Sequence, residues 1–113
     1  WDYDATWGRD IHGERMAADY VRIQGFNTLT ARILDEPDFR RSYKLLLEKT
    51  LQSLFTIEYM KPKILALYDQ IRPFVQMDPY KKSDIERFDR EPEVIFEYIK
   101  NRSQYIKSNL SNL

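Results

Sequence analysis

The feature that most constrains the fold is the helical spacing of apolar residues through nearly all of the chain after residue 28. In three long stretches, 38–55, 57–77 and 92–110, apolar side chains recur at steps of three and four residues. That spacing places them along one face of an α-helix. The sequence therefore predicts a mainly α fold, and we expect the middle of each apolar stripe to be buried, namely Leu47, Leu51, Ile64, Tyr68, Ile95 and Ile99.

Residues that start and stop helices divide this region. Thr28 is suited to cap a short helix at 28–35, which ends before Pro37 because a residue that precedes proline avoids the helical conformation. Thr56 is suited to cap the helix at 57–77 in the same way.

Prolines shape the other helices. Pro62 and Pro73 lie within 57–77, and each removes a backbone hydrogen bond, so we expect a kink or an early stop there. Ser83 and Glu86 have capping-box spacing, which predicts a short helix that ends before Pro92 opens the last one. With the helix at 28–35, the pattern predicts about five helices over 28–110.

The first 27 residues lack any sustained period, and 5–27 contain all three glycines and the one histidine. We interpret 1–4 as a strand end and 5–27 as a long loop. His12 has no second histidine or cysteine beside it, so we assign it no chemical role. Arg9 is suited to contact phosphate or, more simply, to form a local salt bridge with Asp10.

Two carboxylates stand out at the start of the chain. In an extended strand, Asp2 and Asp4 share one face while Trp1 and Tyr3 share the other. Like charges this close repel unless a cation lies between them, and Mg²⁺ is commonly held by one or two carboxylates plus phosphate oxygens. The same D-x-D spacing also fits a strand end whose aspartates are solvated. It fits the metal and sugar-nucleotide site of a glycosyltransferase as well, although this sequence lacks the alternating strand and helix patterns that such enzymes usually carry.

Composition excludes several classes of protein. Lys+Arg and Asp+Glu balance at 18 each, which argues against a broad nucleic-acid-binding surface. No cysteine is present, so there is neither a disulfide framework nor a cysteine-based zinc site. No apolar run approaches the ~20 residues that span a bilayer, so we expect no membrane partner.

A longer string adds a more specific indication. The run Trp-Asp-x-Asp-x-x-Trp-Gly-Arg-Asp at 1–10, followed by Asn27-Thr28-Leu29, Phe39-Arg40 and Tyr43, resembles the spore coat protein H (CotH) kinase family. Members of that family are longer, and the matching residues lie at their C-terminal end. The resemblance therefore implies that 1–113 form a single C-terminal helical segment, the C-lobe portion of an atypical protein-kinase-like fold. The 5–27 loop would take the place of the activation segment.

The resemblance also implies a function. Such a kinase would use ATP and Mg²⁺ to phosphorylate serines of spore coat proteins during coat assembly. It would act in the spore coat or mother-cell cytoplasm of a spore-forming bacterium. Asp2 matches the catalytic, metal-binding aspartate, Asp4 is a second candidate metal ligand, and Trp1 is a candidate for stacking on adenine or for core packing.

The same resemblance places the other catalytic parts elsewhere. The glycine-rich loop, the phosphate-pairing lysine and the catalytic-loop aspartate would lie before Trp1, in an N-terminal part of the same chain that acts as its partner. We therefore expect this segment to be inactive alone. The alternative is a non-catalytic helical interaction or structural module of the spore coat.

Overall fold

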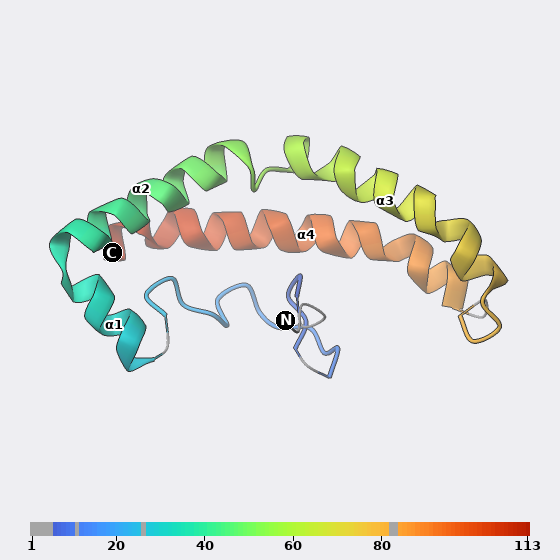
Figure 1. Cartoon of the computed structure of the whole chain (residues 1–113), viewed down its shortest axis with the longest axis horizontal. Coiled ribbons are helices and arrows are strands. Elements are labelled where there is room, and N and C mark those ends of the chain that lie inside the picture. Colours follow the sequence, from blue (N-terminus) through green and yellow to red (C-terminus); the bar gives the residue numbers. More distant parts are fainter. Residues whose placement is uncertain (1–5, 11, 26, 82–83) are drawn as a thin grey trace.

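The computed structural model describes residues 6–10, 12–25, 27–81 and 84–113 (Figure 1). This part of the chain contains four α-helices and a final 3₁₀ turn, Leu110–Asn112. The helices are α1 (Thr28–Asp35), α2 (Pro37–Ser53), α3 (Ile57–Met77) and α4 (Ile85–Asn109). In Figure 1, α2 and α3 follow one another along one side of α4, both antiparallel to it, and the loop before α1 lies along the other side. The last helix is thus the axis on which the other elements pack.

The core consists of two small apolar clusters, and α4 contributes to both. One cluster contains Ile23 from the loop, Leu51 from α2 and Ile106 from α4. The other contains Ile64 from α3 with two residues of α4, Phe96 and Ile99, the second of which is fully buried. Phe55, in the link between α2 and α3, packs against both clusters. The core is therefore a narrow line along α4.

The mainly α prediction is confirmed, and α1 and α3 have the predicted extents, whereas α2 covers 37–53 instead of the predicted 38–55. Leu51, Ile64 and Ile99 are buried as expected. The expectation is wrong for Leu47, Tyr68 and Ile95, which are only half-buried. For Leu47 and Tyr68 the physical reason is that α4 is a single helix, so it covers only part of the apolar stripe on α2 and α3. Ile95 lies on α4 itself and packs against the cluster of Ile64, Phe96 and Ile99 without being enclosed by it.

The two separate helices predicted around Pro92 are in fact one, because α4 runs unbroken from Ile85 to Asn109. Contacts with α3 hold the turn before the proline. The rings of Tyr68 and Phe88 lie 4.7 Å apart. The guanidinium of Arg72 donates to both carboxylate oxygens of Asp89, at 2.7 and 2.6 Å. These contacts, with the burial of Pro92 itself, offset the missing backbone hydrogen bond.

The predicted caps have mixed outcomes. Thr56 caps α3 as expected, since its hydroxyl accepts a hydrogen bond from the N–H of Tyr59 at 3.1 Å. The cap assigned to Thr28 is wrong: the side chain of Asn27 accepts from the N–H of Thr30 at 2.9 Å. The predicted Ser83 capping box falls outside the described residues.

The early stop considered for α3 does not occur, because the helix continues through Pro62 and Pro73 to Met77. Among the helices described, none combines the length and the apolar character that crossing a membrane requires.

Candidate functional site

The residues that sequence reasoning proposed for metal and nucleotide binding, Trp1, Asp2 and Asp4, lie outside the described residues, as does the predicted strand end at 1–4. Their roles stay predictions. What the structure describes is the loop that follows them, from Thr6 to Gly25 with residue 11 omitted, and the surface of α4 on which it lies.

The loop opens with a tight turn. The N–H of Arg9 donates to the carbonyl of Thr6 at 3.1 Å, and the two central residues, Trp7 and Gly8, both have positive φ, of 54° and 77°. Positive φ at both central positions is the mark of a type I′ turn. A bulky residue seldom adopts such a φ, and backbone strain of this kind clusters at functional sites. The Trp7 side chain packs against the cluster around Ile99, which holds the turn in place.

Arg9 joins this turn to α4. One guanidinium nitrogen donates to both carboxylate oxygens of Glu91, at 2.7 and 2.9 Å, and another donates to the carbonyl of Gly13 at 2.8 Å. Both side chains of the ion pair are about three-quarters buried, with exposed fractions of 25% and 22%. The predicted local pairing of Arg9 with Asp10 is therefore wrong. Sequence reasoning missed Glu91 because the two partners are 82 positions apart.

Asp10 organises the next turn instead. Its carboxylate accepts hydrogen bonds from the N–H groups of Glu14 at 2.9 Å and His12 at 2.8 Å. The Glu14 N–H is the main reason that the pKa of Asp10 lies below its ordinary 3.8; partial desolvation opposes this shift, and the N–H of His12 supports it. The residue therefore acts as a structural carboxylate. His12 itself is exposed.

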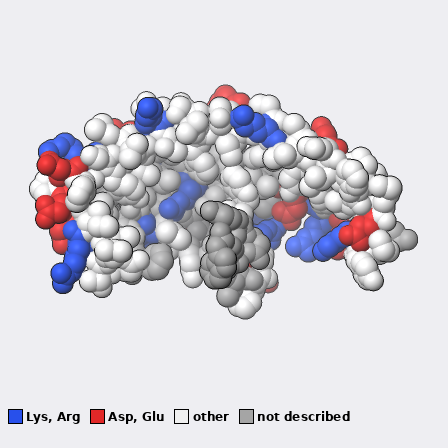
Figure 2. Space-filling view, viewed as in Figure 1, with Lys and Arg blue, Asp and Glu red and all other residues white. Residues whose placement is uncertain are grey.

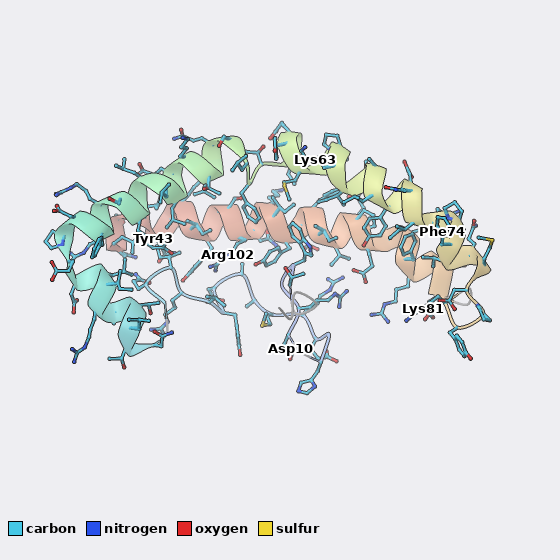
Figure 3. The ribbon with its side chains drawn as sticks, viewed as in Figure 1. Asp10, Tyr43, Lys63, Phe74, Lys81 and Arg102 are labelled. Carbon is cyan, nitrogen blue, oxygen red and sulfur yellow. The ribbon has the colours of Figure 1, made fainter. Side chains whose placement is uncertain are left out.

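Further hydrogen bonds and one buried side chain hold the rest of the described loop. Arg102 of α4 donates to the carbonyl of Ala18 at 2.5 Å, and the Tyr43 hydroxyl of α2 donates to the carbonyl of Ile23 at 2.9 Å. Figure 3 labels both donors on the helices that face the loop. Ile23 itself is 3% exposed. The predicted long loop is thus present without regular helix in its described part, and it is anchored along its length.

A groove of about 200 Å³ lies between the start of the loop and α4. Its lining includes Trp7, Gly8 and Arg15 from the loop and Glu97 and Tyr98 from α4. The groove is close to the turn, and its charged lining residues are Arg9, Arg15 and Glu97. The described ranges contain no cluster of three or more His, Cys, Asp or Glu side chains suited to a metal ion.

A larger cavity, of about 700 Å³, lies elsewhere, between α1 and the end of the chain. Its main cation, Arg40, already donates to the carbonyls of Leu34 and Asp35 and so completes the end of α1. On the face shown in Figure 2, basic and acidic side chains are interspersed among uncharged ones. We therefore place the candidate site at the groove beside the Trp7–Gly8 turn, next in sequence to Asp2 and Asp4.

Comparison with known proteins identifies the family. The family model described as "CotH kinase protein" matches residues 1–106. Inner spore coat protein H of Bacillus subtilis (strain 168) is 85% identical over 113 residues, which are 100% of this chain and 31% of that protein. Inner spore coat protein H-like protein of the same strain is 30% identical over 86 residues, 76% of this chain and 28% of that protein.

The chain thus spans less than a third of the length of each of these curated relatives. The family match begins at Trp1 and ends at residue 106, so it includes the Asp2-x-Asp4 pair, the strained turn, α1 to α3 and α4 except its last three residues. Since the match covers nearly the whole chain, this protein belongs to the CotH kinase family.

Proposed function

We propose that this chain is the helical part of an atypical, Mg-ATP-dependent protein serine kinase that modifies spore coat proteins during coat assembly. The observation that carries the proposal is the family match, which includes the N-terminal aspartates. A relative 85% identical to the whole chain is an inner spore coat protein, which supports a place in the spore coat or the mother-cell cytoplasm.

In this proposal Asp2 holds Mg²⁺, Asp4 binds the metal or orients its ligands, and Trp1 forms a wall of the nucleotide pocket. Mg²⁺ bound to the ATP phosphates offsets the negative charge that develops as the phosphoryl group is transferred. Asp2 supplies a full negative charge to that cation, and this role depends on ionisation more than on shape.

The described residues support the proposal through the loop that follows these aspartates. The Trp7–Gly8 turn is strained, and the Arg9–Glu91 ion pair and the packing of Trp7 hold it on α4. A segment held this firmly in an uncommon conformation is suited to present groups at a site with little reorganisation. Glu91 and Arg9 are positioning residues in this account, since they act through the backbone of the turn.

The test uses a family-length hybrid, in which these 113 residues replace the matched residues of inner spore coat protein H. We expect Asp2→Asn to reduce ATP-dependent labelling of a serine-rich coat protein by about 100-fold or more, because the metal loses its anionic ligand. Asp4→Asn should cost about 10–100-fold if Asp4 only orients the ligands. Asp19→Asn, an exposed aspartate of the same loop, is the matched control and should label normally.

Thermal melting of each variant separates chemistry from folding. Near-normal labelling by Asp2→Asn would remove the metal from this mechanism, and a collapsed melting temperature would make Asp2 a structural residue.

The second candidate is a non-catalytic helical module of the spore coat, which the wide exposed apolar faces of α2 and α3 favour. If this candidate is right, the family-length hybrid without any substitution should bind coat proteins but transfer no label from ATP.

A further inference from the structure

The chain has more surface than a folded monomer of its size. Its accessible surface is 8861 Å² for 13.7 kDa, which exceeds by roughly 2,300 Å² the value typical of monomers of that mass. Its radius of gyration is 17.1 Å, against about 13 Å for a compact domain of this length. An excess of that size is comparable with the total area of a large, permanent interface.

Much of this surface is apolar and continuous with the stripes that form the core. On α2, Leu46 is 63% exposed and Phe39 is exposed as well. On α3, Leu67, Ile71 and Phe74 are exposed. All five belong to the apolar stripes that the sequence spacing places along one face of each helix, and α4 leaves them uncovered. The stripes are therefore wider than the core they meet.

The uncovered residues of the two helices lie on the same side of the molecule. Leu46 precedes the half-buried Leu47 by one position, and Leu67 precedes the half-buried Tyr68 by one position. Both helices run in the same direction along α4 (Figure 1). A residue one position before a half-buried one is therefore turned to the same side of either helix, so both exposed stripes lie on one side of the molecule. We call Phe39, Leu46, Leu67, Ile71 and Phe74 the apolar face. The described loop contacts α2 through Tyr43 and Leu51, but it leaves all five residues of this face exposed.

We propose that the apolar face is covered by the part of a family-length chain that lies outside these 113 residues. The curated relatives have more than two-thirds of their length beyond the matched segment, enough for a second body of comparable or larger size. A covalently linked partner also has the advantage over a second copy, because it loses little translational freedom on docking. The inference goes beyond the proposed function, since it holds whether or not the protein transfers a phosphoryl group.

Thiol accessibility in the family-length hybrid tests this docking, because the 113 residues contain no cysteine of their own. Cysteines in the rest of the hybrid are first replaced by serine. Leu46→Cys and Phe74→Cys are then made singly, and each is labelled with a maleimide in the native protein and in urea. Leu45→Cys is the matched control, because Leu45 and Leu46 are neighbours on α2 with 62% and 63% exposure, but Leu45 is turned away from the apolar face.

We expect native labelling at positions 46 and 74 to be slower than in urea by about tenfold or more, since a buried thiol reacts only when the surface opens. At position 45, the labelling rates in the native protein and in urea should differ by no more than about twofold. Rapid native labelling at 46 and 74 would overturn the inference. So would protection that disappears on dilution of the protein, which would identify a second copy as the occupant.

Discussion

The two sides of α4 are held by different means. On one side, α2 and α3 pack through aliphatic and aromatic side chains, chiefly Leu51 and Ile64 against Phe96, Ile99 and Ile106. On the other side, the loop is held mainly by individual polar contacts, including the Arg9–Glu91 pair and the bond from Arg102 to Ala18, and its apolar contacts are those of Ile23 and Trp7. Apolar packing is spread over many atoms, whereas each polar anchor is a single point. We infer that the loop can be released by one substitution that leaves the helices folded.

The largest effect should come from Ile99→Ala, which removes the fully buried residue on the helical side. Loss of its methyl groups and the cavity left behind should lower the free energy of unfolding by about 2–5 kcal/mol. Urea unfolding of the family-length hybrid measures this. Leu45→Ala, at an exposed site on α2, is the control and should change stability by no more than about 0.5 kcal/mol. Equal effects of the two would mean that α4 is not the axis of the core.

Gly8→Ala should release the start of the loop. A Cβ at Gly8 would lie 2.4 Å from a ring carbon of Tyr98, and its φ of 77° already disfavours a side chain. Gly13→Ala is the matched control, because Gly13 has a φ of 79° but no atom within 4 Å of an added Cβ. The positive φ alone should lower the free energy of unfolding of each variant by about 1–2 kcal/mol. The clash with Tyr98 should lower it by about 1–3 kcal/mol more, and only in Gly8→Ala.

Hydrogen exchange resolved by mass spectrometry follows this difference. Gly8→Ala should speed the exchange of loop amides more than Gly13→Ala does, with α4 unchanged in both. If the two variants exchange alike, the contact with Tyr98 does not hold the turn.

Glu91→Gln should have a smaller effect on the same part of the molecule. The amide keeps one acceptor but removes the charge that faces Arg9, and we expect a cost of about 1–2 kcal/mol for this largely buried pair. Exchange of the 6–16 amides should increase, and ATP-dependent labelling should fall if the turn positions the aspartates. Glu93→Gln, on the exposed side of the same helix, is the control and should change neither the amide exchange nor the labelling.

The smallest effect concerns pH and the turn at Asp10. The pKa of this carboxyl is lower in the folded chain than its ordinary 3.8, because the N–H groups of Glu14 and His12 favour the ionised form. Its stabilising contribution is therefore present above the unfolded pKa and lost as the pH falls through the folded value. Exchange of the Glu14 amide should speed up below about pH 4, after correction for the intrinsic rate. In Asp10→Asn that additional pH dependence should vanish.

Sequence reasoning was accurate for the parts of the fold that depend on neighbours in the chain. The apolar spacing and the Thr56 cap located α1, α2 and α3, because i, i+3 and i, i+4 contacts are written in one stretch of sequence. It failed at Pro92, where local chemistry argues for a break and packing against Tyr68 and Arg72 of α3 overrides it. It also failed at Arg9, whose partner is distant in sequence.

By itself, the sequence determined that this protein is mainly helical, that a long aperiodic loop precedes the helices, and that the chain resembles the CotH kinase family. Only the tertiary structure decided which part of each apolar stripe is buried, because periodicity identifies a face but not the width that a neighbour covers. It also decided how the loop is held. Arg9 and Glu91, or Ile23 and Leu51, meet only after the chain has folded along α4, and no local pattern records that proximity.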